Sequence, residues 1–336
     1  MRKFARARPR TVTVGILGLF VTVTLLLTAN GGGEPVQVQV PAGSTSPQIA
    51  LILEENEVIG SATLFHTYVR LRRADRDLKA GTYLLETGSS MGRALRSLRL
   101  GTVETVPVTI PEGFQIADMV PRISEISGAS EDEVLEQLRE EGVAERYGLP
   151  GPTLEGYLFP DTYRFARGVP VSAIVDAMVE RYREVWTSER RAKLEESGMS
   201  EREVVTLAAI IQAEARQVTE MPRISGVYHN RLRDGWLLQA DPTVIYALGG
   251  YRERLLYAAI DSVRDNPYNT YSNRGLPPGP IASPGARAID AALEPEQHSF
   301  MYFVAWPDGF HIFTETLAQH NAAKEDARKA RQSDGK

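Results

Sequence analysis

The first thirty residues constrain this chain more than any other segment. Thr11 to Asn30 is a run of twenty residues without a charged side chain, about the length that a helix needs to cross a bilayer. Five basic residues precede this run, namely Arg2, Lys3, Arg6, Arg8 and Arg10. Because basic flanks stay in the cytoplasm, we expect a cytoplasmic tail at 1–10, a transmembrane helix at 11–30 and the rest outside the cell membrane. A cleaved signal peptide is the alternative, but the apolar run is long for one.

Composition and charge narrow the possible partners of the remaining chain. With 336 residues, 43% hydrophobic and 24% charged, the chain is long enough for about two domains with their own cores. It contains no cysteine, so no disulfide or thiolate chemistry is available. Without the five basic residues of the tail, 33 Lys and Arg face 43 Asp and Glu, a net charge of −10. This acidity argues against nucleic acid and favours a neutral polymer or a protein as the partner.

The pattern of apolar residues predicts an α+β fold. Val36 to Val40 alternates apolar and polar side chains, as a half-buried strand does. Further strands are expected at 81–86 and 103–110, and helices at 47–58, 61–73, 90–99, 173–189, 201–216 and 223–234. Near the C-terminus we expect a strand, a turn at 307–309, a second strand and the start of a helix. The predicted division is a linker at 31–35, a small α+β domain at 36–110, a helical connection at 111–150, a larger mixed catalytic domain at 151–322 and a charged tail at 323–336.

One helix carries a carboxylate on its apolar face. In Val204–Arg216, Val204, Leu207, Ile210 and Ile211 recur at helical spacing, and Glu214 continues the same stripe. Burying a carboxylate is unfavourable unless it is paired or protonated. Such a placement raises the pKa of the carboxyl group, as a catalytic acid requires near neutral pH. The alternative is a structural acid bonded to a backbone amide or to Arg216.

Two segments after this helix combine polar side chains with aromatic rings. They are 237–250 and 266–285, and the second is dense in proline and glycine, so its backbone should be stiff. Tyr268, Asn269, Thr270 and Tyr271 offer the amides, hydroxyls and flat rings that recognise carbohydrate. A purely structural role for this loop is the alternative.

An ordered set of motifs resembles the MltG (YceG-like) family of endolytic peptidoglycan transglycosylases. After the N-terminal anchor, the motifs are KAGTY at 79–83, TIPEG at 109–113, LEGYLFPDTY at 154–163, LAAIIQAEA at 207–215, NRL at 230–232, LQADPTVIYALG at 238–249, YNTY at 268–271 and GLPPGPIASPG at 275–285. The resemblance implies a single membrane-spanning helix, a LysM-like domain at 36–110 and a catalytic domain. It also implies cleavage between N-acetylmuramic acid and N-acetylglucosamine inside glycan strands, leaving 1,6-anhydro-muramyl ends. The expected partners are these strands and the cell-wall synthases.

The resemblance assigns the catalytic role to Glu214. The family usually has two acids in this helix, whereas here the first position is Gln212 and only Glu214 remains. A hydrolysing glycosidase normally needs two carboxyl groups. A lytic transglycosylase needs no external nucleophile, because the C6 hydroxyl of the muramyl ring attacks C1, and one carboxyl group can act as acid and then as base. By resemblance and chemistry, the expected substrate-binding residues are Gln239, Thr243, Tyr268, Asn269 and Tyr271. No metal or cofactor is expected.

Two other classes of function remain as alternatives. The first is a membrane-tethered, non-catalytic glycan-binding scaffold in which Glu214 is structural. The second is a metal or serine hydrolase. The sequence gives the second little support, since it has no GxSxG motif and its five histidines are scattered without ligand spacing.

Overall fold

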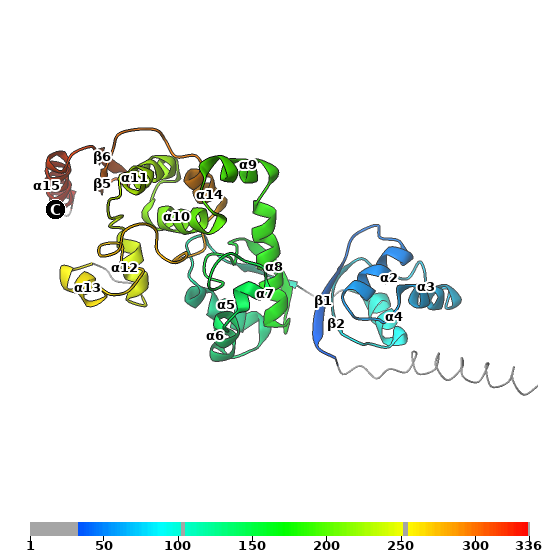
Figure 1. Cartoon of the computed structure of the whole chain (residues 1–336). Coiled ribbons are helices and arrows are strands. Elements are labelled where there is room, and N and C mark those ends of the chain that lie inside the picture. Colours follow the sequence, from blue (N-terminus) through cyan, green and yellow to red (C-terminus); the bar gives the residue numbers. More distant parts are fainter. Residues whose placement is uncertain (1–32, 102–104, 251–254, 335–336) are drawn as a thin grey trace, which may run out of the picture. The chain divides into compact units, whose positions relative to one another are not determined.

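The structure is a computed structural model that describes residues 33–101, 105–250 and 255–334 (Figure 1). The predicted transmembrane helix at 11–30 lies outside these residues, and no helix within them has the length and apolar character of a membrane span. The chain forms two compact units. Among the described residues, the smaller unit contains 33–101, 105–107, 126–128 and 164–174, and the larger unit contains the others.

The smaller unit builds its core on a two-stranded antiparallel sheet. Strand β1 (Pro35–Val40) pairs with β2 (Gly81–Glu86), with Val38 opposite Tyr83. Helices α2 (Ser46–Glu55), α3 (Ala62–Leu71) and α4 (Met91–Leu100) complete the unit. The core side chains come from all five elements and include Val38, Leu53, Phe65, Tyr83 and Leu98, each at most 1% exposed. The strands and helices predicted here are confirmed within a few residues, whereas the LysM-like assignment stays a prediction.

The middle of the chain contains elements that the sequence only partly predicted. Strand β3 (Thr105–Thr109) pairs with β4 (Thr162–Ala166), a strand that was not predicted. The helices of this part are α5 (Ile116–Ser127), α6 (Glu131–Arg139), α7 (Val143–Arg146), α8 (Val171–Val185) and α9 (Ser188–Ser197). The helix predicted at 173–189 ends earlier, at Val185. The Thr187 side chain then accepts a hydrogen bond from the backbone amide of Arg190 and caps the start of α9.

Helix α10 (Glu201–Glu214) is the central element of the larger unit. It starts with a capping box. The Ser200 hydroxyl accepts a hydrogen bond from the backbone amide of Glu203, and the Glu203 carboxylate accepts one from the backbone amide of Ser200. All eight residues from Val204 to Ile211 are buried. The helix packs against α11 (Met221–Arg233), α12 (Asp241–Ala247) and α14 (Ala286–Leu293), which lie around it in Figure 1. An apolar sequence has therefore produced a buried helix whose C-terminal end carries Glu214.

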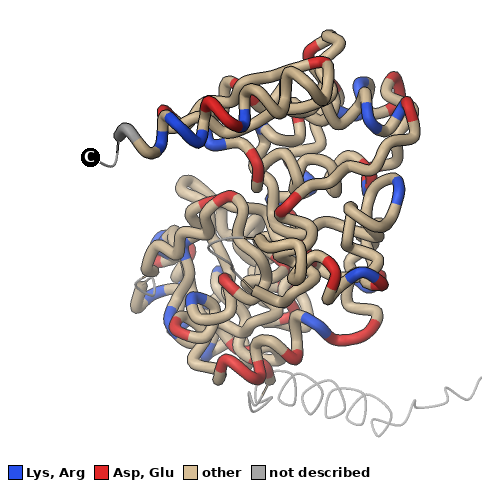
Figure 2. Tube along the Cα trace, turned by 90° about the vertical axis from the view of Figure 1, so that its left-hand side faces the viewer, with Lys and Arg blue, Asp and Glu red and all other residues tan. Residues whose placement is uncertain are grey.

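The remaining elements come after α10 in the sequence. They are the 3₁₀-helix η1 (Val218–Glu220), α13 (Tyr257–Ser262), the antiparallel strands β5 (Tyr302–Ala305) and β6 (His311–Thr314), and α15 (Leu317–Asp334). The predicted hairpin is confirmed, and α15 runs through most of the predicted charged tail. Charges of both signs lie along α15 (Figure 2), where Arg328–Glu325 and Lys329–Asp326 pair at i,i+3 spacing and support the helix.

Candidate active site

Glu214 is the last residue of α10, and its carboxyl group is partly buried. The next residue, Ala215, has an extended backbone, so the helix ends where the acid emerges from the apolar core. The hydroxyl of Tyr228 donates a hydrogen bond of 3.0 Å to Glu214 Oε1. Burial raises the pKa of Glu214 to about 7, and the nearby charge of Asp241 adds to this rise, while the Tyr228 hydroxyl and the charge of Arg231 oppose it. The carboxyl group is therefore substantially protonated near neutral pH.

Tyr228 and Arg231 reach the site from one face of α11, three residues apart. Both are almost fully buried, with exposures of 1% and 7%. Arg231 donates from Nε to the carbonyl of Met301 at 2.8 Å and from Nη1 to the carbonyl of Leu238. Through these two hydrogen bonds, the guanidinium group connects α11 to the segment before α12 and to the residue that precedes β5.

Asp241 is an exposed acid in the first turn of α12. The hydroxyl of Tyr271 donates a hydrogen bond to its Oδ1. Burial raises the pKa of Tyr271, and the bond to Asp241 raises it further, so the phenol stays protonated as a donor. A loop residue, Tyr271, therefore holds the second carboxylate of the site.

Three of the predicted substrate-binding residues present side chains that are not fully buried. Tyr271 and Tyr268 are half-buried, and the Tyr268 ring lies 4.9 Å from that of Tyr246. Gln239 is exposed and has a positive φ of 49°, a conformation that costs energy for a residue with a side chain. The backbone amide of Gln239 donates a hydrogen bond of 3.1 Å to the carbonyl of Thr270, and this bond stabilises the strained turn. Sugar contact remains a prediction for these three residues.

The other two predicted substrate-binding residues, Thr243 and Asn269, are fully buried, at 0% exposure. The Asn269 amide group donates to the carbonyls of Ile260 and Val263 and accepts the amide of Tyr271. The Thr243 hydroxyl donates to the carbonyl of Ala240 and lies 2.8 Å from the Thr270 hydroxyl. These bonds to the chain itself indicate that both residues shape the loops that carry Tyr271 and Asp241.

Gln212, at the position where the resembling family has its first acid, has a structural partner. Its Oε1 accepts the amide of Gly285 at 3.1 Å. A Cβ atom on Gly285 would lie 2.0 Å from a carboxylate oxygen of Glu112, so a larger residue there would have to displace the tip of that side chain. Gln212 therefore fastens the end of the 275–285 loop to α10.

A second buried acid, Glu155, has an environment different from that of Glu214. It is 5% exposed and accepts the amide of Ile116 at 3.1 Å from one oxygen and 3.4 Å from the other, at the start of α5. Burial raises its pKa to about 7 as well, against the effect of that amide and of a hydrogen bond with Tyr246. Glu155 thus accepts a hydrogen bond from a free backbone amide in the first turn of α5. We therefore interpret Glu155 as structural and Glu214 as the candidate acid.

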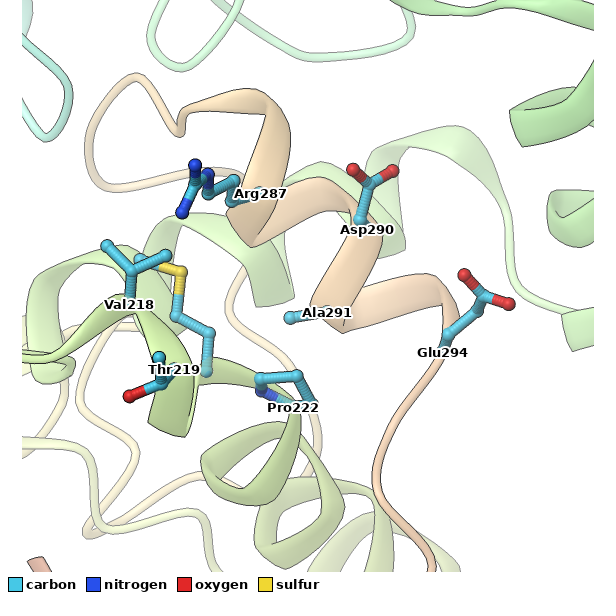
Figure 3. A pocket seen from close by; sticks show the side chains of 8 residues that line it. Val218, Thr219, Pro222, Arg287, Asp290, Ala291 and Glu294 are labelled. Carbon is cyan, nitrogen blue, oxygen red and sulfur yellow. The ribbon is translucent and has the colours of Figure 1, made fainter.

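Figure 3 shows a cavity of about 290 Å³ that is separate from Glu214. Its lining comes from η1, the start of α11 and α14, and consists of Val218, Thr219, Met221, Pro222, Arg287, Asp290, Ala291 and Glu294. Asp290 binds Arg190, and Glu294 binds Lys193 at 2.8 Å. Both carboxylates already have cationic partners and point away from Val218 in Figure 3, so this cavity contributes no second catalytic acid.

Comparison with known proteins places this geometry in a family. The sequence profile of the YceG-like family matches residues 38–326, which is most of the chain. The chain belongs to the YceG-like family. The endolytic murein transglycosylase of Bacillus subtilis (strain 168) is 34% identical to it over 309 residues, covering 86% of this chain and 84% of that protein. The endolytic murein transglycosylase of Streptococcus pneumoniae (strain D39) is 27% identical, and the chain spans only 54% of its length. The crystal structure of a yceG-like protein from Listeria monocytogenes matches with a TM-score of 0.60 and 33% identity, covering 87% of this chain and 99% of that one.

In this YceG-like chain, sequence reasoning missed three residues of the site: Tyr228, Arg231 and Asp241. Tyr228 and Arg231 share one helical face, a pattern that is also typical of an ordinary packed helix. Asp241 precedes Pro242 at the start of α12, a common arrangement at helix N-termini. Arg231 and Asp241 lie inside the motifs NRL and LQADPTVIYALG, which was the signal available for them, whereas Tyr228 lies outside every motif and only its contact with Glu214 distinguishes it.

Proposed function

We propose that this YceG-like protein is a membrane-anchored endolytic lytic transglycosylase that cleaves bonds between N-acetylmuramic acid and N-acetylglucosamine in peptidoglycan. The observation that carries the proposal is Glu214, a partly buried acid with a pKa of about 7 at the C-terminal end of α10. A relative that is 34% identical over most of the chain is named an endolytic murein transglycosylase. The chain is accordingly an enzyme of the lyase class, acting on a polysaccharide.

Glu214 acts in this proposal first as an acid and then as a base. The protonated carboxyl group donates its proton to the glycosidic oxygen as the bond from C1 to that oxygen breaks. The resulting carboxylate accepts the proton of the C6 hydroxyl while the C6 oxygen forms the new bond to C1. No water enters, and one proton passes from the C6 hydroxyl to the leaving group through Glu214. The Tyr228 hydrogen bond orients the carboxyl group for both steps.

Asp241 supplies the negative charge that the oxocarbenium-like transition state requires. Its charge already acts on Glu214, and Tyr271 holds it by a hydrogen bond. The same pair of acids favours one alternative, a hydrolase in which Asp241 activates a water molecule. The non-catalytic glycan-binding scaffold is the other alternative, and in it Glu214 has no catalytic role.

The anchor and the smaller unit complete the proposal. A transmembrane helix at 11–30, followed by a linker at 31–35, would hold the catalytic unit close to the outer face of the cell membrane. Newly made glycan strands and their synthases lie there, so cleavage would end strand elongation. The LysM-like domain at 36–110 is the proposed second contact with the strand.

Product analysis tests this function. Full-length protein in detergent is incubated with purified glycan strands, and the products are separated and identified by mass spectrometry. We expect internal cleavage that shortens long strands early and creates 1,6-anhydro ends. The control is Glu196→Gln, the same chemical change at an exposed position of α9, which should cleave like the wild type. Strands that stay intact with the wild-type protein would support the scaffold instead.

The pH dependence of cleavage should follow the ionisation of Glu214. Because the reaction starts from the protonated acid, we expect kcat/KM to fall about tenfold per pH unit above about pH 7. The measurement is the initial rate at low substrate concentration between pH 5 and pH 9, expressed as kcat/KM. A rate that still rises at the alkaline end would contradict the assigned role.

Substitutions of two neighbours of Glu214 should shift the alkaline limb, the fall of kcat/KM above about pH 7, in opposite directions. The Tyr228 hydroxyl stabilises the carboxylate and lowers its pKa, so Tyr228→Phe should shift the limb to higher pH. The charge of Asp241 raises the pKa, so Asp241→Asn should shift the limb to lower pH. The residual rates of both variants are measured over the same pH range. Shifts in the same direction would mean that the limb reports another group.

A further inference from the structure

We propose that Trp236, Tyr302 and His320 form an aromatic subsite that stacks on a sugar ring of the glycan strand, beyond the bond next to Glu214. Trp236 follows the end of α11, Tyr302 begins β5 and His320 lies in the first turns of α15. The Trp236 and Tyr302 rings lie 5.9 Å apart at an angle of 72°. The Tyr302 and His320 rings are stacked at 5.1 Å and 22°. Three elements that are separate in sequence thus converge on one aromatic cluster, within the larger unit.

The backbone fixes Trp236 although its side chain is 43% exposed. The Trp236 amide donates to the carbonyl of Arg231 at 2.8 Å, and Gly235 makes the preceding turn with a φ of 69°. The guanidinium group of Arg274, from the 266–285 loop, donates to the carbonyl of Gly235. The indole ring also packs edge-to-face against Tyr302, and a ring positioned in this way yet open to solvent loses little conformational entropy when a ligand covers it.

Arg231 connects this cluster to the candidate acid. Its guanidinium carbon lies 5.6 Å from the centre of the Tyr302 ring. The same charge acts on Glu214, where it lowers the pKa of the carboxyl group. The cluster and Glu214 therefore both lie near the buried Arg231 side chain, and we expect a single glycan strand to reach both.

The chemistry of the cluster suits a neutral sugar such as N-acetylglucosamine. The exposed indole of Trp236 can pack against the apolar C–H face of a pyranose ring, while His320 and Arg231 contact the Tyr302 ring that supports it. Burial lowers the pKa of His320, with help from the charges of Lys324 and Arg231, so its ring is neutral at pH 7. Its Nδ1 is buried, and no hydrogen-bond partner for it lies among the described residues.

The occupant follows from the proposed function, on which this inference rests. An enzyme that cleaves inside a strand must bind sugars on both sides of the broken bond. Glu214, Asp241 and Tyr271 surround the bond itself, so further sugars need surfaces at a distance from these residues. The aromatic cluster offers such a surface, and its exposed ring needs no rearrangement to bind.

Binding of a short oligosaccharide to the inactive protein tests the subsite. Full-length Glu214→Gln in detergent is titrated with the tetramer of N-acetylglucosamine, and heat release and tryptophan fluorescence are recorded. We expect Trp236→Ala in this background to weaken binding about tenfold, as the loss of one aromatic stacking contact does. Trp236→Phe should recover most of the affinity. Tyr257→Ala, which removes an aromatic side chain that is 83% exposed on α13, is the matched control and should bind like its parent.

The outcomes separate this subsite from the proposed reaction. Saturable binding that depends on Trp236, in a protein whose wild type makes no anhydro ends, would keep the subsite and overturn the reaction. Normal formation of anhydro ends, with equal binding and an unchanged KM in Trp236→Ala, would overturn the subsite alone. Absence of saturable binding by Glu214→Gln itself would also contradict the subsite.

Discussion

Glu214→Gln is expected to lower the rate of glycan cleavage by about 10²- to 10⁴-fold, because a glutamine amide cannot transfer the proton that the leaving oxygen needs. Gln keeps the size of the side chain, and its Oε1 can still accept the hydrogen bond from Tyr228. The measurement is the rate of anhydro-end formation by the variant at pH 6, with Glu196→Gln as the control. Undiminished cleavage would remove Glu214 from the mechanism.

The stability of the same variant shows whether lost activity reflects lost structure. The pKa of Glu214 is raised from 4.5 to about 7 in the folded protein, so its contribution to stability is full below pH 4.5 and is lost as the pH rises through 7. At pH 8 the ionised wild-type carboxylate therefore destabilises the fold, by roughly 1–3 kcal/mol for a partly exposed group. Glu214→Gln should consequently unfold at a higher temperature than the wild type at pH 8. A lower unfolding temperature would mean that the substitution damages the fold.

Arg231→Met should produce the largest loss of stability in the site. The substitution leaves the carbonyls of Met301 and Leu238 without their donor in a region where Arg231 is only 7% exposed. We expect a loss of about 3 kcal/mol in the free energy of unfolding of the larger unit, measured with urea. Activity should fall with it, because the segment before Asp241 is no longer fastened to α11.

Arg233→Met is the matched control for this prediction. Arg233 lies two residues further along α11, and its side chain is 67% exposed in a pair with Asp234. It also donates a hydrogen bond of 2.9 Å to Asn230 Oδ1, so its loss should lower the free energy of unfolding by about 1 kcal/mol, well below the effect of Arg231→Met. Equal effects of the two substitutions would mean that Arg231 has no special role in joining α11, β5 and the loop.

The placement of Glu214 could be predicted because it depends on local sequence. The spacing of Leu207, Ile210 and Ile211 defines a face of α10, and the acid on that face is at the edge of the core. Its partners could not be predicted in this way. Tyr228 and Asp241 reach it from α11 and α12, and such contacts depend on how helices pack rather than on the pattern within any one of them.

The loop residues show why sequence reasoning was less successful outside helices and strands. A loop has no periodicity that tells which side chains point inward, so the polar residues of YNTY looked equivalent. The structure separates them: Asn269 is buried in hydrogen bonds to the backbone, whereas Tyr271 reaches Asp241. Small amides at turns commonly bond to their own backbone in this way.

Several helices were missed for reasons that lie in their composition. Helix α9 has no buried residue, so it shows no apolar stripe. Helix α12 starts with Asp241-Pro242 inside 237–250, a segment for which the sequence predicts no helix. At the first helical positions, however, proline lacks only an amide that would have no partner there. Both helices therefore begin with local signals, the Thr187 cap of α9 and the N-terminal proline of α12, which a search for an apolar stripe does not detect.

Oxygen-isotope labelling tests the central claim most directly. Cleavage is run in water enriched in a heavy oxygen isotope, and the new ends are analysed by mass spectrometry. If Glu214 directs attack by the C6 hydroxyl, the products carry 1,6-anhydro ends without label from the solvent. If Asp241 activates water instead, each new reducing end carries one labelled oxygen, and that result would contradict the lytic mechanism.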